Sequence, residues 1–250
     1  MSQVFVVDRA AFFGGAWPDG FVPMAGRAAA EFLDRALTLG RFVDREEAER
    51  TPAWKQWIPY CVIRARAATP RETGLAPTDP RAPLTGLFHV QRTTGQGETR
   101  LHGARSIGLG GHVDPEDGAG AGTPDGPTFF RRALVRELEE ELLGDGAGWA
   151  PRFVGLLNDD RTPVGTVHAG LVHVHDLVAD LAAARAGVRI REIAKMHGGF
   201  GSLVEFHELW QDSAKFESWS RLLIEAGVAG PMALPQRSDD PGPDHSANGR

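Results

Sequence analysis

The stretch Arg136-Glu-Leu-Glu-Glu-Glu141 follows a glycine-rich turn, Gly108-Leu-Gly-Gly-His-Val-Asp-Pro-Glu-Asp117. On a helix of 3.6 residues per turn, the carboxylates of Glu137, Glu140 and Glu141 fall on one arc about 100° wide. Two carboxylates about 4 Å apart repel each other by roughly 4 kcal/mol at an effective dielectric constant near 20. This crowding predicts a neutralising cation, and a hard divalent ion with oxygen ligands is the natural candidate.

The expected helix also carries an apolar stripe, which repeats every fourth residue at Phe130, Leu134, Leu138 and Leu142. The acidic arc lies beside this stripe, so we expect it at the edge of the buried surface. Partial burial favours metal binding, because a desolvated cluster of carboxylates without a cation is costly. Glu139 lies off the arc and is expected to be a solvated surface residue.

The glycines of the turn indicate a close approach of the backbone to a ligand. Without side chains, Gly108, Gly110 and Gly111 let carbonyl and N–H groups come near a metal ion or a phosphate. His112 is interpreted as a turn residue, and His168, His173 and His175 as strand residues, in preference to metal ligands.

The two segments together resemble the motif of Nudix hydrolases. That motif is a Gly, five residues, a Glu, seven residues, and then Arg-Glu-apolar-any-Glu-Glu-any-Gly. Here Gly111 precedes Asp117 by the same spacing, and residues 136–141 fit the helical half without a mismatch. The turn and the later Phe216-Glu-Ser-Trp-Ser220 are similar to a bacterial, MutT-like branch of predicted phosphoesterases. The resemblance extends over most of residues 1–228, and its specific part is 106–143.

Three positions depart from the motif. Asp117 replaces the usual Glu, and eighteen residues separate it from Arg136, so an 11-residue glycine-rich insertion is present. The insertion falls in a loop, where extra length costs little free energy. Leu143 stands where a glycine is expected, with Gly144 one place later, which moves the expected end of the helix. None of these changes removes a carboxylate of the acidic arc.

The resemblance implies a role for each matching residue. Glu137, Glu140 and Glu141 would bind Mg²⁺, or Mn²⁺ as a substitute, with help from the Gly110 carbonyl, and Arg136 would orient the carboxylates. Water would attack a phosphorus atom of a diphosphate. One carboxylate, such as Glu137, would accept the proton of that water, although the family uses different bases in different members.

Substrate contacts are expected outside the carboxylates. Gly111 and Asp117 border the expected site, and Asp117 is equally well interpreted as a loop cap. Arginines on or near the bordering strands are plausible phosphate contacts, although each alone is more often a surface charge: Arg92, Arg100, Arg105 and Arg161. Lys195 with Gly198-Gly199 is a further candidate, as a substrate lid.

The pattern of apolar and turn residues predicts a mixture of helices and strands without regular alternation, typical of an α+β or mixed α/β domain. Strands are expected at 3–8, 58–65, 86–92, 99–108, 152–157 and 166–176, and helices at 24–39, 128–143, 202–210 and 214–226. Asp44 is expected to cap a short helix ending before Pro52, with loops at 68–83 and 118–127 and a turn at Thr162-Pro-Val-Gly165. The resemblance implies an α/β/α sandwich around a mixed sheet, as one domain over 1–228. We expect an N-terminal extension over about 1–55, extra C-terminal helices, and a disordered tail at 229–250.

Composition limits the partners. The chain has 250 residues and a net charge of −6, so no general attraction to nucleic acid or to an anionic membrane is expected. No run approaches the roughly 18–20 apolar residues of a membrane span, and the cytoplasm is the expected location. The single cysteine, Cys61, cannot form an internal disulfide and is interpreted as a buried strand residue. The sequence leaves a homodimer open.

These observations predict a Mg²⁺-dependent hydrolase that cleaves a phosphoanhydride in a small, nucleotide-derived molecule, such as a nucleoside diphosphate linked to another moiety. One alternative is a diphosphate isomerase on the same fold, which needs a catalytic cysteine and another acid; the lone Cys61 counts against it. The other alternative is a non-catalytic ligand-binding module, which predicts a damaged acidic helix.

Overall fold

The computed structural model describes residues 2–67, 83–93, 103–119, 124–144, 148–191, 193–194 and 196–230. The strands are β1 (Gln3–Asp8), β2 (Gly20–Pro23), β3 (Arg41–Asp44), β4 (Trp54–Arg66), β5 (Leu84–Arg92), β6 (Arg105–Ser106), β7 (Gly108–Gly110), β8 (Leu142–Leu143), β9 (Arg152–Asn158), β10 (His168–Val178), β11 (Arg189–Ile190) and β12 (Met196–Gly201). The helices are α1 (Arg9–Phe13), α2 (Gly26–Leu39), α3 (Arg45–Glu49), α5 (Gly126–Glu141), α6 (Pro163–Val167), α7 (Leu181–Gly187), α8 (Leu203–Trp210) and α9 (Ser218–Glu225), with 3₁₀ turns η2 (Pro115–Gly118) and η3 (Ser213–Lys215).

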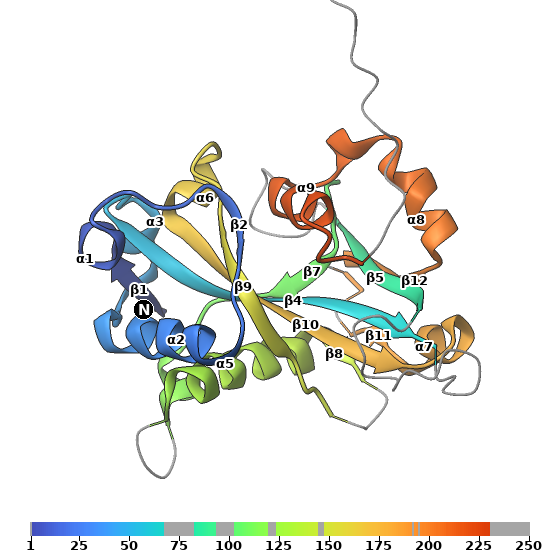
Figure 1. Ribbon diagram of the computed structural model, residues 1–250, viewed down its shortest axis with the longest axis horizontal. Coiled ribbons are helices and arrows are strands. Elements are labelled where there is room, and N and C mark those ends of the chain that lie inside the picture. Colours follow the sequence, from blue (N-terminus) through green and yellow to red (C-terminus); the bar gives the residue numbers. More distant parts are fainter. Residues whose placement is uncertain are drawn as a thin grey trace, which may run out of the picture.

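A mixed sheet in the order β12-β5-β4-β10-β9-β2 organises the molecule. Its two long central strands, β4 and β10, run parallel, and the other neighbours along this path pair antiparallel. Helices α2 and α5 lie on one face of this sheet, and α8 and α9 lie on the other (Figure 1). The expected α/β/α sandwich is therefore confirmed.

Strand β4 shows how the sequence fits between the two helical layers. Tyr60 and Val62 pack into the cluster that contains residues of α8 and α9, whereas Cys61 and Ile63 pack against α5. The alternation follows from the two-residue period of a strand. Cys61 is buried, as predicted. Because helices cover both faces of β4, its sequence is a nearly continuous run of apolar residues.

The N-terminal segment is built into the same sheet. Strand β1 pairs antiparallel with β3 and with the first residues of β4. The predicted cap of α3 is present, since the Asp44 carboxylate accepts hydrogen bonds from the N–H groups of Glu46 and Glu47. Helix α2 ends at Leu39, as the expected helix at 24–39 does, and Gly40 follows in an extended conformation. A Cβ at Gly40 would lie 2.2 Å from Cε1 of Phe5.

Helix α5 differs from its prediction at its C-terminal end. Asp125 caps the start by accepting a hydrogen bond from Thr128, and the helix ends at Glu141 instead of residue 143. Leu142 and Leu143 instead form β8, which pairs with Ile190 and Arg189 of β11. Strand pairing with a distant segment therefore ends the helix, and the prediction that Gly144 marks its end is wrong.

Other boundaries also change. The expected strand at 99–108 is divided at Ile107 into β6 and β7, and its first residues lie outside the described part of the chain. The expected turn at Thr162–Gly165 begins helix α6, because the Thr162 hydroxyl accepts from the Gly165 N–H. The expected helix at 214–226 is shorter, as η3 and α9.

The described part of the expected substrate lid is a strand, not a loop. Gly198 and Gly199 lie inside β12, paired with Val90 and His89 of β5, while Lys195 is outside the described residues. Also outside the described residues are 68–82, 94–102, 120–123 and 231–250. These include Arg100, most of the expected 68–83 loop, four residues of the expected 118–127 loop and most of the expected tail. Within the described residues, no helix is long and apolar enough to cross a membrane.

Leu138 tests the packing of α5 on the sheet. Its side chain is fully buried among residues of β4 and β5, so Leu138→Ala should lower the free energy of unfolding by about 2–5 kcal/mol in urea denaturation. Val204→Ala is the control, because Val204 is 70% exposed on α8 and should change stability by roughly 0.5 kcal/mol or less. Equal losses in both variants would contradict this packing.

Candidate functional site

The guanidinium of Arg136 joins helix α5 to the glycine-rich turn. Its Nε donates to Oδ1 of Asp117 at 2.9 Å, and Nη2 donates to Oδ2 at 3.0 Å. Nη2 also donates to the backbone carbonyl of His112 at 2.9 Å. A paired contact of this kind fixes the orientation of the guanidinium as well as its charge.

The same guanidinium also contacts two carboxylates of the acidic arc. Nη1 lies 2.9 Å from an oxygen of Glu137 and 3.3 Å from an oxygen of Glu140. The hydrogen bonds that Arg136 donates to Asp117, followed by the charges of Asp117 and Glu137, raise the pKa of Arg136, so it remains cationic. The contacts agree with the orienting role that the resemblance implied.

Glu137 is the most buried of the acids that contact this guanidinium from α5. Its side chain is 17% exposed, compared with 59% for Glu140. Loss of solvent raises the pKa of Glu137, even though Arg136 acts in the opposite direction. The ionised carboxylate is thus under-compensated by its protein neighbours, and a further cation would stabilise it.

The turn leaves space for this carboxylate because residue 111 is a glycine. A Cβ at Gly111 would lie 2.3 Å from Cδ of Glu137 and would displace it. Gly110 is constrained from the other side: β7 pairs with β4, and a Cβ at Gly110 would lie 2.0 Å from the Pro59 carbonyl oxygen. The two glycines therefore allow the turn to lie between the sheet and the acidic helix.

The donor set fits a hard divalent cation. The helical spacing of Glu137, Glu140 and Glu141 places them on one side of α5, and Mg²⁺ prefers oxygen ligands. Among the described residues their carboxylate oxygens do not all lie within 4.8 Å of one another, so the side chains must move together to share one ion. Glu141 is half-buried, whereas Glu139 is exposed, as its position off the arc predicted. The residues that are present thus suit Mg²⁺ or Mn²⁺.

Asp117 is 4% exposed, and its oxygens are already engaged. Besides holding Arg136, its Oδ2 accepts a hydrogen bond from the Asp114 N–H at 2.8 Å, which closes a capping box around η2. These contacts favour a positioning role for Asp117 over direct contact with a substrate.

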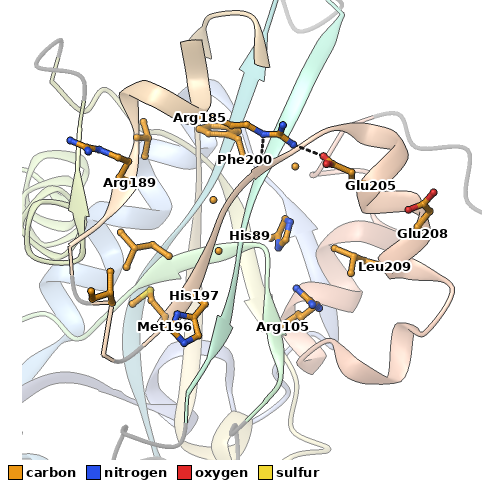
Figure 2. A pocket seen from close by; sticks show the side chains of 16 residues that line it. His89, Arg105, Arg185, Arg189, Met196, His197, Phe200, Glu205, Glu208 and Leu209 are labelled. Atoms are coloured by element: carbon orange, nitrogen blue, oxygen red, sulfur yellow. Dashed lines mark hydrogen bonds and ion pairs between the residues drawn. The ribbon is translucent and has the colours of Figure 1, made fainter. Parts of the chain in front are cut away.

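The predicted arginines are separated by the fold. Arg105, on β6, lines a pocket with a volume of about 950 Å³, whereas Arg92 ends β5 and is not among the lining residues. Arg161 is bound to Asp159 at 2.7 Å, away from that pocket. Figure 2 shows the other basic side chains of the pocket, which are Arg185, Arg189, His89 and His197.

One wall of the pocket is connected to the acidic end of α5, although no residue of α5 lines the pocket. Strand β11, which forms part of its wall, pairs with β8, and the Arg191 N–H donates to the Glu141 carbonyl at 2.8 Å. Arg185 is already paired with Glu205 at 2.6 Å (Figure 2). Among the described residues, neither Arg105 nor Arg189 forms an ion pair with a carboxylate, although both line the pocket.

Sequence reasoning did not identify Arg185, Arg189 or His197 as site residues. They belong to α7, β11 and β12, none of which was predicted. Asp180 accepts a hydrogen bond from the Ala183 N–H at 2.8 Å. Asp180 before Leu-Ala-Ala-Ala-Arg is a helix N-cap pattern from which α7 could have been predicted.

Comparison with known proteins agrees with the fold and the motif. The chain is 30% identical over 199 residues to Protein YmaB of Bacillus subtilis (strain 168). The aligned region covers 78% of this chain and 82% of YmaB. The chain is also similar to the crystal structure of Tm1382, a putative Nudix hydrolase. The TM-score is 0.60 and the identity 26%, with coverage of 90% of this chain and 97% of Tm1382. No protein-family model matches the chain. The chain belongs to the Nudix superfamily and, within it, to the same family as YmaB.

Glu137 should lower the stability of the metal-free fold and should contribute to metal binding. Because burial raises its pKa, the ionised side chain destabilises the metal-free fold at neutral pH, and this cost disappears as the pH falls below the raised pKa. Glu137→Gln should therefore unfold at a higher temperature than the wild type in EDTA at pH 7, and should lose stabilisation by Mg²⁺. Glu140→Gln, at a more exposed position, should change the metal-free melting temperature much less. A lower metal-free melting temperature for Glu137→Gln would contradict the desolvation argument.

Proposed function

We propose that this protein is a Mg²⁺-dependent hydrolase of a phosphoanhydride bond. The observation that carries the proposal is the under-compensated carboxylate of Glu137, held by Arg136 beside Glu140 and against Gly111. When bound, Mg²⁺ supplies positive charge to the diphosphate oxygens and lowers the pKa of coordinated water.

The roles of the residues follow from their contacts. Glu137, Glu140, Glu141 and the Gly110 carbonyl would hold the cation, and Arg136 keeps the first two carboxylates in place. One of these carboxylates, such as Glu137, would accept the proton of the attacking water. Such help is typically worth about 10²–10⁴-fold in rate.

The pocket beside α5 supports a phosphorylated small molecule as substrate. Its volume of about 950 Å³ falls in the range typical of small-molecule sites. It gathers arginines although the whole chain has a net charge of −6, so the positive charge is local. A nucleoside diphosphate linked to a second group would place its phosphates near Arg105 and Arg189 and the bond to be cleaved toward α5.

Two alternatives receive less support. An isomerase that uses a cysteine would need Cys61, but this thiol is fully buried in β4, and burial raises its pKa far above neutrality. A non-catalytic binding module would not need the arrangement of Arg136, Glu137 and Glu140, which is complete here.

The activity is tested with a panel of nucleotide sugars, dinucleoside polyphosphates, NADH, ADP-ribose, CoA and nucleoside triphosphates, each with Mg²⁺ or Mn²⁺. Phosphate-containing products should form only when the divalent ion is present. No turnover on the whole panel together with no binding of Mg²⁺ or Mn²⁺ would favour the binding module.

Two substitutions test the carboxylates. Glu140→Gln and Glu141→Gln should each lower kcat by more than about 100-fold, because loss of an outer-shell partner alone typically costs 10–100-fold. Glu139→Gln is the matched control on the same helix, and it should keep the wild-type rate because Glu139 is exposed and off the arc. Unchanged activity in both Glu140→Gln and Glu141→Gln would refute the assignment of the metal site.

The pocket is tested separately. Arg105→Ala and Arg189→Ala should raise KM for the best substrate of the panel by about 10-fold or more, since each removes a charged contact worth roughly 1.5–3 kcal/mol. Arg221→Ala, on the exposed side of α9 and outside the pocket, should leave KM unchanged. Equal KM values for all three variants would place the substrate elsewhere.

A further inference from the structure

Three side chains from distant parts of the chain meet next to the glycine-rich turn. They are Glu49 at the end of α3, His112 just after β7, and His168 at the start of β10. Nε2 of His168 lies 3.4 Å from Nε2 of His112 and 3.6 Å from a carboxylate oxygen of Glu49. One ligand atom from each residue can be chosen so that all three lie within 4.8 Å of one another.

These distances match the edges of a tetrahedral metal site. With metal–ligand bonds of about 2.0–2.1 Å, two ligand atoms at a tetrahedral angle are about 3.3–3.4 Å apart. The separation between the two imidazole nitrogens agrees with this value, and that between His168 and Glu49 exceeds it by only a few tenths of an ångström. Small side-chain movements would complete the geometry.

The ring of His168 is oriented as a metal ligand requires. Its Nδ1 lies 2.8 Å from the Val164 carbonyl oxygen, which can only accept, so Nδ1 carries the proton. In the neutral ring Nε2 is then unprotonated, and it lies on the side of His112 and Glu49, where it can offer its lone pair to a metal ion. Histidine ligands are typically held by such a hydrogen bond from the second nitrogen to a backbone carbonyl.

A direct hydrogen bond between the two rings explains only part of this arrangement. It would account for the contact of His112 with His168, but it does not require a carboxylate at 3.6 Å from the same nitrogen. Two imidazoles and one carboxylate are, in contrast, the usual protein ligands of zinc sites that keep a fourth position open.

We propose that Glu49, His112 and His168 bind a divalent transition-metal ion of the Zn²⁺ type. Nitrogen ligands favour such an ion, whereas the all-oxygen set on α5 favours Mg²⁺, so the two sites would select different metals. Three protein ligands leave one position for water. The site does not depend on the proposed hydrolase activity, because none of its ligands is a carboxylate of the acidic arc.

The ion would also connect the N-terminal segment to the turn. Glu49 belongs to α3, whereas the backbone carbonyl of His112 accepts a hydrogen bond from Arg136. A metal ion bound to the His112 side chain would therefore fix the residue whose backbone carbonyl accepts the hydrogen bond from Arg136.

The test uses the full chain stripped of metal with a chelator and then titrated with Co²⁺ in the presence of excess Mg²⁺. The wild type should bind one Co²⁺ per chain with the intense visible absorption of tetrahedral cobalt, and one equivalent of Zn²⁺ should abolish that absorption. Glu49→Gln and His168→Gln should weaken Co²⁺ binding by at least 10-fold.

Two control variants distinguish Co²⁺ bound at this site from Co²⁺ bound by other side chains. His173→Gln removes another buried histidine of β10, whose Nδ1 also contacts a backbone carbonyl, that of Leu171. Glu140→Gln removes a carboxylate of α5. Both should keep the wild-type cobalt spectrum. If the fold of His168→Gln is altered by circular dichroism, Glu49→Gln decides the matter, since Glu49 is 31% exposed. A wild type without tetrahedral Co²⁺, or Co²⁺ binding of unchanged affinity in Glu49→Gln, would overturn the proposal.

Discussion

The site depends on one guanidinium, that of Arg136, which lies between two groups of carboxylates. On one side it is held by Asp117 and the His112 carbonyl of the turn, and on the other it contacts Glu137 and Glu140 of α5. One positive charge shared in this way cannot neutralise all of its partners. The remaining negative charge, partly desolvated at Glu137, is what makes a divalent cation favourable at this place.

The rest of the fold brings these groups together. Pairing of β7 with β4 fixes the turn against the sheet, and the absence of a Cβ at Gly111 lets Glu137 approach it. Directly after the acidic end of α5, pairing of β8 with β11 stops the helix and places Arg189 opposite Leu143. The acidic helix and the basic pocket are therefore neighbours because a two-residue strand replaces the last turn of the helix.

The sequence predicted the parts of this arrangement that depend on local periodicity. The apolar stripe of α5, the strand expected at 58–65 and the cap at Asp44 are all present. The strand at Leu142 was not predicted, because its partner lies almost fifty residues away and the pattern Leu-Leu fits a helix equally well. The contact of His168 with Glu49 depends on the parallel pairing of β10 with β4, which no local pattern contains.

The central claim is that the carboxylates of α5 hold an oxygen-ligated divalent cation. Crystals of the full chain soaked in Mn²⁺ test it most directly, because anomalous scattering locates the ion without reference to activity. The account predicts a manganese peak bonded to oxygens of Glu137, Glu140 and Glu141. A structure in which these carboxylates hold no ion at saturating Mn²⁺, with Glu137 still beside Arg136 alone, would contradict it.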